Sequence, residues 1–158
     1  SIYAMGGSAG GTLVAAALNQ TPDLFDGAVL KVPFVDVVNS MSDSSLPLTA
    51  QQYEEWGNPN IEDELKVMKQ YDPYLNLRKQ AYPPILIQIG LNDRRVPYWE
   101  GAKYYAKLNE LTTGHGPYLL STSFTQGHST DRRKSLSQQA FEYAFLLSLT
   151  LKDIKAEQ

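Results

Sequence analysis

The sequence predicts an α/β fold in which a mostly parallel sheet is flanked by helices. Short apolar runs bounded by glycine and proline, which are typical of buried strands, alternate along the chain with longer stretches of helical periodicity. The first run leads into Gly6-Gly7-Ser8-Ala9-Gly10, and an alanine-rich stretch follows. This order of strand, sharp turn and helix is the context of one catalytic motif of α/β proteins. Polar residues suited to catalysis follow two later runs, so a site is expected at the carboxyl edge of the sheet.

Four strands and four main helices are predicted in chain order. The strands are expected at residues 1–6, 27–34, 84–90 and 117–124. The helices are expected at residues 9–20, 62–71, 98–111 and 135–152. Residues 35–60 are rich in Ser, Asp, Asn and Pro, and a segment of this length in a compact domain is expected to be functional or partly helical. Residues 72–84 are predicted to be a turn-rich connection.

The closing helix carries apolar side chains at helical spacing. Its two rows consist of Leu136, Ala140, Tyr143 and Leu147, and of Phe141, Phe145 and Leu149. Rows with this spacing are typical of a helix that covers a core, so both are predicted to be buried.

Ser8 is the candidate nucleophile. The motif around it fits Gly-x-Ser-x-Gly, in which the serine occupies a strained turn with its hydroxyl exposed. The small residues beside it leave room for that turn. The backbone N–H of Ala9, at the start of the helix, is predicted to donate to a developing oxyanion. Because the same pattern also occurs in ordinary glycine-rich turns, the acid and the histidine decide the interpretation.

An acid and a histidine follow later strands, in the order serine, acid, histidine that this motif requires. Asp93 comes after the third strand and His128 after the fourth. The carboxyl ends of parallel strands share one edge, so both side chains are expected beside Ser8. His115, the only other histidine, precedes the fourth strand and is expected in a surface loop at the opposite edge.

These roles define a serine hydrolase. His128 would take the Ser8 proton as general base and return it to the leaving group, while Asp93 would orient the imidazole and stabilise its charged form. A second oxyanion donor is expected from upstream of the serine strand. An α/β-hydrolase sheet normally builds several strands before the nucleophile, so residues 1–158 are expected to be the carboxyl-terminal part of a catalytic domain. We expect this piece alone to have poor stability, since its sheet edge is uncovered, and no activity.

Two stretches are more specific than the serine motif. They are Val32-Pro33-Phe34-Val35-Asp36-Val37 and Glu54-Glu55-Trp56-Gly57-Asn58-Pro59. Shorter ones accompany them, among them Pro22-Asp23-Leu24-Phe25, Gly90-Leu91-Asn92-Asp93 and Tyr98-Trp99-Glu100. In these stretches, which run through nearly the whole chain, the sequence resembles the prolyl oligopeptidase family of serine peptidases (peptidase family S9), most closely its oligopeptidase B (protease II) branch.

The resemblance implies a peptidase that cleaves short peptides after Arg or Lys. Ser8, Asp93 and His128 match the positions of the family's catalytic triad. The resemblance also implies a propeller domain, amino-terminal to this region, which caps the active site and excludes folded proteins. It further implies a cytoplasmic location.

Acidic residues just before Trp56 are implied by the resemblance to select the basic side chain of the substrate. Where the family has two glutamates, this sequence has Gln52 and Glu54. Glu54 would face the substrate cation, whereas Gln52 offers only neutral hydrogen bonds. The preference for Arg and Lys is therefore expected to be weakened, or restricted to one of them. Glu55 is expected to be a solvated helix charge.

The loop after the histidine departs from the family pattern. The family follows this histidine with two glycines, whereas here Ser129, Thr130 and Asp131 follow His128. Side chains at these positions restrict the backbone, so a different loop geometry is expected. Asp131 is expected to pair with the basic residues 132–134 rather than with the histidine.

The composition argues against several other functions. A net charge of −3 and an isoelectric point of about 5.3 leave no basic patch for nucleic acid. The sequence has no run of 18 apolar residues to span a membrane and no cysteine for a disulfide or a thiolate metal site. Two separated histidines form no metal-binding motif, and neither a metal nor another cofactor is expected.

Two other functions remain open. One is a carboxylesterase-type hydrolase with the same triad, against which the stretch Glu54-Glu55-Trp56 argues. The other is a catalytically inactive binding or scaffold domain, which the change at Gln52 and the changes after the histidine keep open. Peptide and ester substrates separate the two hydrolases, and covalent labelling of Ser8 separates both from the inactive domain.

Overall fold

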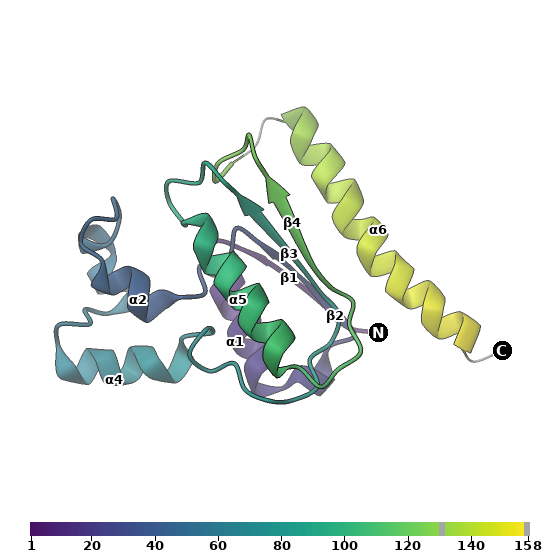
Figure 1. Ribbon diagram of the computed structural model, residues 1–158, viewed down its shortest axis with the longest axis horizontal. Coiled ribbons are helices and arrows are strands. Elements are labelled where there is room, and N and C mark those ends of the chain that lie inside the picture. The colour runs from purple at the N-terminus through teal and green to yellow at the C-terminus, as the bar shows by residue number, and fades with distance from the viewer. Residues whose placement is uncertain (130–131, 157–158) are drawn as a thin grey trace.

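The computed structural model describes residues 1–129 and 132–156, and the surroundings of side chains for residues 1–129 and 135–151. Four strands form one sheet in the order β1, β2, β3, β4 (Figure 1). They are β1 (Tyr3–Gly7), β2 (Gly27–Lys31), β3 (Ile85–Gly90) and β4 (Tyr118–Ser123). All three neighbouring pairs are parallel, so the four carboxyl ends meet at one edge. The predicted parallel sheet is confirmed.

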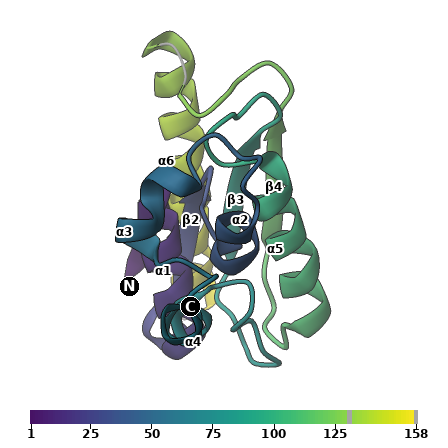
Figure 2. The ribbon, with the colours of Figure 1, turned by 90° about the vertical axis from the view of Figure 1, so that its left-hand side faces the viewer.

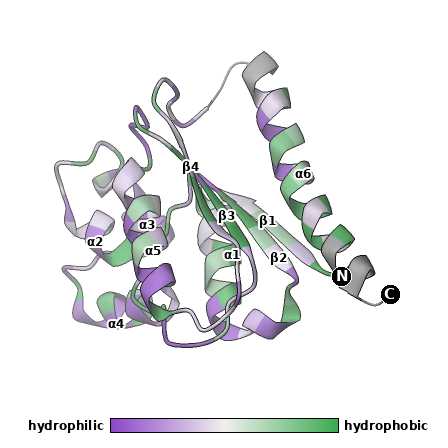
Figure 3. Cartoon of the chain, turned by 45° about the vertical axis from the view of Figure 1, so that its right-hand side comes forward, coloured by the Kyte–Doolittle hydropathy of each residue, from purple (hydrophilic) through white to green (hydrophobic). Residues whose placement is uncertain are grey.

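Helices cover both faces of this sheet. One face carries α1 (Ala9–Gln20) and α5 (Tyr98–Leu111), and the other carries α6 (Arg132–Ala156) (Figure 1). The strands alternate their side chains between the two faces, because successive residues of a strand point to opposite sides. Ile85 and Ile87 belong to the core under α1 and α5, whereas Leu86 packs with Phe145 and Leu149 of α6. Figure 3 shows the apolar strands enclosed between these helices.

A further group of short helices lies beside the carboxyl edge of the sheet (Figures 1 and 2). It consists of α2 (Val37–Ser42), α3 (Tyr53–Trp56) and α4 (Glu62–Tyr71), and short 3-10 turns lie at Pro22–Leu24 and Ala50–Gln52. This group has a small core of its own, formed by Phe34, Val37, Met41, Met68 and Val96. The expectation that the long segment after β2 is partly helical is therefore confirmed.

The second strand is shorter than predicted. It was expected to extend over residues 27–34, but β2 ends at Lys31. Val32 donates its N–H to the carbonyl oxygen of Gln88 at 2.7 Å and then adopts a φ of 39°, which turns the chain out of the sheet. A positive φ is rare for a β-branched residue, so sequence propensity favoured a longer strand.

The prediction for the closing helix is only partly right. Phe145 and Leu149 are buried against the sheet. The exposed members of the predicted rows are Leu136, Ala140, Phe141, Tyr143 and Leu147. The physical reason is that α6 meets the sheet along one narrow face only, so apolar side chains on its opposite side remain outside the core.

The two ends of the sheet differ as expected. His115 precedes β4 at the amino edge and is exposed, in agreement with its predicted place in a surface loop. Within the described residues, β1 pairs only with β2 and forms the outer strand of the sheet. None of the helices in the part of the chain that the structure describes is long and apolar enough to cross a membrane.

Candidate active site

Ser8 occupies the turn between β1 and α1. Its φ of 52° and ψ of −123° form a strained conformation, which costs a non-glycine residue roughly 1–3 kcal/mol. The surrounding backbone imposes it: the Ser8 N–H donates to the carbonyl oxygen of Lys31 at 2.9 Å. The Ser8 carbonyl oxygen accepts the N–H groups of Gly11 and Phe34, at 2.9 and 3.1 Å. The fold therefore holds a serine on a strained strand-to-helix turn, as the motif predicts.

Glycines beside the serine are required by close packing. A Cβ atom on Gly6 would collide with the carbonyl oxygen of Gly10, in the first turn of α1. A Cβ atom on Gly11 would lie 2.6 Å from Cβ of Pro33, in the chain that leaves β2. Without side chains at these positions, the serine turn can lie directly against both its own helix and the neighbouring strand end.

Asp93 follows β3 and is held by its own loop. Its Oδ1 accepts the N–H groups of Arg95 and Val96 at 2.8 and 2.9 Å, and its side chain is fully buried. Its own N–H donates to the carbonyl oxygen of Gly90 at 3.1 Å. Because the backbone occupies Oδ1, Oδ2 is left for the histidine: it lies 2.8 Å from Nδ1 of His128. The structure therefore brings the predicted acid and the predicted histidine into contact.

His128 follows β4 and lies in the loop that continues from it. Its side chain is mostly buried, with 18% of its surface exposed. Because Nδ1 donates to the carboxylate of Asp93, the tautomer is fixed and the other ring nitrogen, Nε2, is free to accept a proton. This arrangement is the one that a histidine general base needs.

The loop that carries the histidine rests on the end of β3. The carbonyl oxygen of Gln126 accepts the N–H of Asn92 at 3.2 Å. A Cβ atom on Gly90 would lie 2.7 Å from the carbonyl oxygen of Gln126 and 2.8 Å from that of Gly127. The acid loop and the histidine loop are thus packed backbone to backbone, and only glycine fits at the end of this strand.

The contact between acid and histidine is present although the glycines of the family pattern are missing. Ser129, the first of the replacements, lines the cavity beside His128. Thr130 and Asp131 lie outside the described residues, as do the side chains at 132–134 with which Asp131 was expected to pair.

Ser8 and His128 open into one cavity of about 110 Å³. The other residues that line it are Ala9, Phe34, Leu48, Gln52, Glu55, Trp56, Arg95 and Val96. The rings of Phe34 and Trp56 meet edge to face, with their centroids 4.9 Å apart, and form an aromatic wall. Ala9 begins α1, so its N–H has no carbonyl one turn earlier in the helix and is available at the cavity wall.

The residues expected to select a basic side chain lie close to this cavity. Gln52 lines it, as does Glu55, whereas Glu54 is exposed and is not among the lining residues. The cavity therefore presents Glu55, which the sequence suggested to be only a solvated charge. Both carboxylates are accessible to solvent, and the role of Glu54 toward a substrate stays a prediction.

Sequence reasoning assigned no role to Arg95 and Phe34, although both line the cavity. Arg95 is exposed and lies two residues after Asp93. This closeness to the predicted acid is the feature of the sequence that could have identified Arg95 as a residue of the site. Phe34 belongs to one of the family-like stretches, but the turn at Val32 that aims it at the cavity is not visible in the sequence.

A larger cavity, of about 400 Å³, lies on the α6 side of the same serine and histidine. Its wall includes Lys31 of β2 and Glu142 of α6, whose charged groups are 3.2 Å apart. Glu142 is buried, and this pair links the helix to the sheet. In the part of the chain that the structure describes, no group of three or more histidine or acidic residues is placed to hold a metal ion.

A parallel sheet with a serine on a strained turn, and with an acid and a histidine at the same edge, defines an α/β-hydrolase. Comparison with known protein families agrees with this class and narrows it. The chain belongs to the prolyl oligopeptidase family, whose model matches residues 1–152.

Curated relatives of this chain include two peptidases. The chain is 43% identical over 148 residues to dipeptidyl aminopeptidase BI of Pseudoxanthomonas mexicana, covering 92% of this chain and 20% of that protein. It is 42% identical over 146 residues to protease 2 of Moraxella lacunata, covering 91% of this chain and 21% of that protein. The chain thus spans about a fifth of the length of these relatives.

Solved structures show the same similarity. Oligopeptidase B from Trypanosoma brucei, in a closed form with covalently bound antipain, matches with a TM-score of 0.91 and 48% identity over 94% of this chain and 21% of that one. Oligopeptidase B from Leishmania major matches with a TM-score of 0.90 and 45% identity, over 93% of this chain and 21% of that one.

Proposed function

We propose that this chain carries the catalytic centre of a serine endopeptidase that hydrolyses peptide bonds in short peptides, after Arg or Lys. The observation that carries the proposal is the 2.8 Å contact between Asp93 Oδ2 and Nδ1 of His128, which lines one cavity together with Ser8. Membership of a peptidase family supports a peptide rather than an ester substrate.

The proposed reaction passes through an acyl-enzyme. Nε2 of His128 takes the proton of Ser8 Oγ as the oxygen attacks the carbonyl carbon of the substrate, and the imidazolium then gives that proton to the leaving amine. Water repeats the two steps on the ester, which releases the acid product and restores the serine. Asp93 keeps Nδ1 protonated and stabilises the imidazolium.

The developing oxyanion needs hydrogen-bond donors that are already in place. The N–H of Ala9, at the positive end of α1, is the donor that we assign within this chain. In this fold the second donor comes from a segment before the serine strand.

We further propose that the cavity beside Ser8 accepts the side chain that precedes the cleaved bond. Its aromatic wall would contact the apolar stem of Arg or Lys, and Gln52 with a neighbouring glutamate would meet the charged end. A guanidinium held by one carboxylate and one amide is bound less tightly than one held by two carboxylates. The preference for basic residues is therefore expected to be reduced.

The partners that we propose follow from the family. A propeller domain, amino-terminal to this region in the full-length protein, would cover the cavity and limit substrates to short peptides. We propose a cytoplasmic location and no nucleic acid, membrane or cofactor as a partner. By itself the chain is expected to be inactive, because the proposed reaction also needs a second oxyanion donor and a propeller domain.

The test uses the protein at its full natural length. A fluorophosphonate probe should label Ser8, and Ser8→Ala and His128→Ala should abolish the adduct, which is mapped by mass spectrometry. Matched peptides with Arg, Lys or norleucine before the scissile bond should be cleaved with a preference for the cations. Peptides with a blocked amino terminus show whether the cut is internal, as an endopeptidase requires.

Each alternative has its own signature in this test. Labelling of Ser8 with turnover of esters but not of peptides would indicate a carboxylesterase. No labelling of a folded protein would indicate an inactive binding domain and would refute the proposal.

A further inference from the structure

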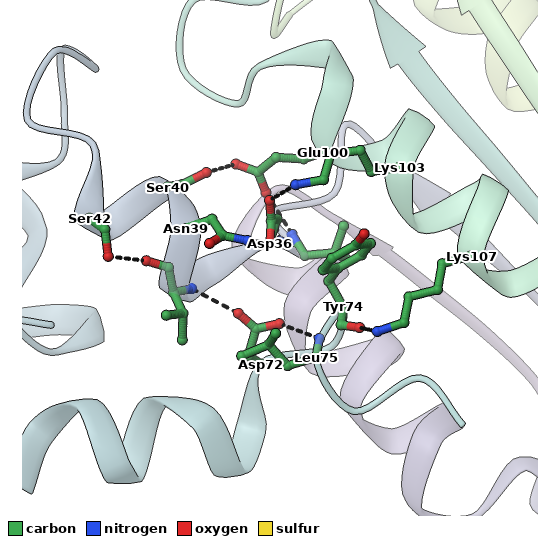
Figure 4. A network of polar contacts seen from close by, with 12 residues as sticks. Asp36, Asn39, Ser40, Ser42, Asp72, Tyr74, Leu75, Glu100, Lys103 and Lys107 are labelled. Carbon is green, nitrogen blue, oxygen red and sulfur yellow. Dashed lines mark hydrogen bonds and ion pairs between the residues drawn. The ribbon is translucent and has the colours of Figure 1, made fainter. Parts of the chain in front are cut away.

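A buried carboxylate that the proposed mechanism does not use lines a small void next to the cavity. Glu100, in the first turn of α5, has no exposed surface. Its Oε2 accepts the N–H groups of Val35 and Asp36 at 2.9 and 3.0 Å, and its Oε1 accepts the hydroxyl of Ser40 at 2.6 Å. Figure 4 shows this carboxylate above the start of α2. Both of its oxygens therefore hold the segment that leaves β2.

That segment forms one wall of the cavity. Phe34, at its beginning, and Gln52 and Trp56, near its end, are lining residues. The two parts are connected, because the hydroxyl of Thr49 donates to the carbonyl oxygen of Ser40 at 3.0 Å. A shift of the anchored part would therefore move the residues that face the substrate.

The acid loop forms a second wall, through Arg95 and Val96. This loop runs directly into α5, where the N–H of Glu100 donates to the carbonyl oxygen of Pro97 at 3.0 Å. The backbone of Glu100 is thus continuous with the acid loop, and its carboxylate binds the segment that leaves β2. Glu100 therefore connects the two walls of the cavity.

We propose that Glu100 is a positioning residue for the substrate, which fixes the distance between the two walls of the cavity. The inference rests on the proposed peptidase function and adds a residue that sets substrate fit. Glu100 acts through Phe34, Gln52 and Trp56, since it contacts segments of the walls and not the reacting atoms.

The surroundings of this carboxylate make its charge depend on pH near neutrality. Burial raises the pKa of Glu100 to about 7, and the nearby carboxylate of Asp36 raises it further. The three hydrogen bonds that Glu100 accepts act in the opposite direction and lower this pKa. Lys103 partly neutralises the negative charge of Asp36, because its Nζ lies 2.5 Å from Asp36 Oδ2. Arg95 lines the same small void as Glu100, and Asp72 faces α2 from the α4 side, its own pKa raised by burial. Figure 4 shows the acids and Lys103 around α2.

Two variants of the full-length protein test the proposal. Glu100→Ala removes all three contacts and should raise KM for a basic peptide by about tenfold or more, because small misplacements of binding groups are costly. Its kcat and the rate at which a small fluorophosphonate labels Ser8 should stay within about twofold. Glu100→Gln can accept both N–H groups on its amide oxygen and donate to the oxygen of Ser40, so its KM should lie well below that of Glu100→Ala, at the value that the wild type reaches when Glu100 is protonated.

The pH dependence separates positioning from packing alone. In the wild type, KM should rise as the pH falls through about 7, because a neutral carboxyl accepts weaker hydrogen bonds than a carboxylate. Glu100→Gln should lose this rise. Wild type and variant both keep Ser8, Asp93 and His128, so the difference between their profiles reports Glu100.

A matched control corrects for lost stability. Asn19 is also buried and bridges segments, donating to the carbonyl oxygen of Pro73 at 2.9 Å and accepting the hydroxyl of Tyr82 at 3.0 Å, but it lies at the far end of α1. Asn19→Ala should lower the melting temperature and leave KM unchanged.

Four outcomes decide the matter. An unchanged KM in Glu100→Ala, or an equal rise in Asn19→Ala, overturns the inference while the peptidase function stands. Unchanged hydrogen exchange of amides 35–42 in Glu100→Ala also overturns it, since the anchored segment must loosen. A wild-type protein that the fluorophosphonate does not label refutes the peptidase function itself, and the inference with it.

Discussion

Replacing Gly90 by alanine should separate catalysis from folding at this site. The new Cβ atom would lie 2.7 Å from the carbonyl oxygen of Gln126 and 2.8 Å from that of Gly127, whereas ordinary contact begins at 3.4 Å. The loop that carries His128 must therefore retreat by about 0.6–0.7 Å. Because a displacement of about 1 Å can cost about a hundredfold in rate, kcat should fall on the order of tenfold to a hundredfold.

The assay is steady-state hydrolysis of a basic peptide by the full-length protein, beside thermal unfolding. Gly27→Ala is the matched control, because its Cβ atom would lie 2.6 Å from Cδ1 of Leu149, a similar overlap at the opposite edge of the sheet. Gly90→Ala should lose about 1–3 kcal/mol of stability and Gly27→Ala no more than that, because the end of the Leu149 side chain can move. Only Gly90→Ala should lose activity. A kcat for Gly90→Ala within twofold of the wild type, or an equal loss in the control, would refute the reasoning.

Three further predictions follow from the same contacts. Asp93→Asn should fold normally and lower kcat on the order of a thousandfold or more, measured by peptide hydrolysis, because the amide no longer stabilises the imidazolium. Gln52→Glu should raise the ratio of kcat/KM for Arg peptides to kcat/KM for norleucine peptides about tenfold, because a second carboxylate then meets the guanidinium. Glu54→Gln and Glu55→Gln, measured in the same way, show which glutamate binds the cation together with residue 52. A ratio that none of the three variants changes contradicts the proposed pocket. Between pH 4.5 and 7, Glu100 binds its proton more tightly in the folded than in the unfolded protein. The free energy of unfolding should therefore fall as the pH rises through this range, by at most about 3 kcal/mol. Urea unfolding of Glu100→Gln at several pH values should not show this fall.

Much of the fold could be predicted because its signals are local. Glycine and proline delimit the buried strands, and helical periodicity identifies α1, α4 and α5, whose observed ends match the predicted ones. The errors arose where long-range packing decides. Val32 leaves the sheet through a positive φ that its β-branched side chain disfavours. Tyr143 and Leu147 of α6 are exposed because the helix meets the sheet on one face.

The candidate site was predictable to the extent that parallel strands bring their carboxyl ends together. That rule places Asp93 near His128, and the structure adds the 2.8 Å contact. It gives no information on groups that act through another segment. Glu100 looks in the sequence like an ordinary acid in the first turn of a helix, and its burial depends on the segment folded over it.

The order of strands in the sheet has a kinetic consequence. Because β1, β2, β3 and β4 are neighbours in chain order, each can add to the one before it as the protein is synthesised or refolds. Ser8 enters with the first strand and His128 with the last, and Asp93 receives its histidine only when β4 has joined β3. In a refolding experiment, the return of serine reactivity would therefore time the docking of this last strand, whereas far-UV circular dichroism would follow the earlier steps.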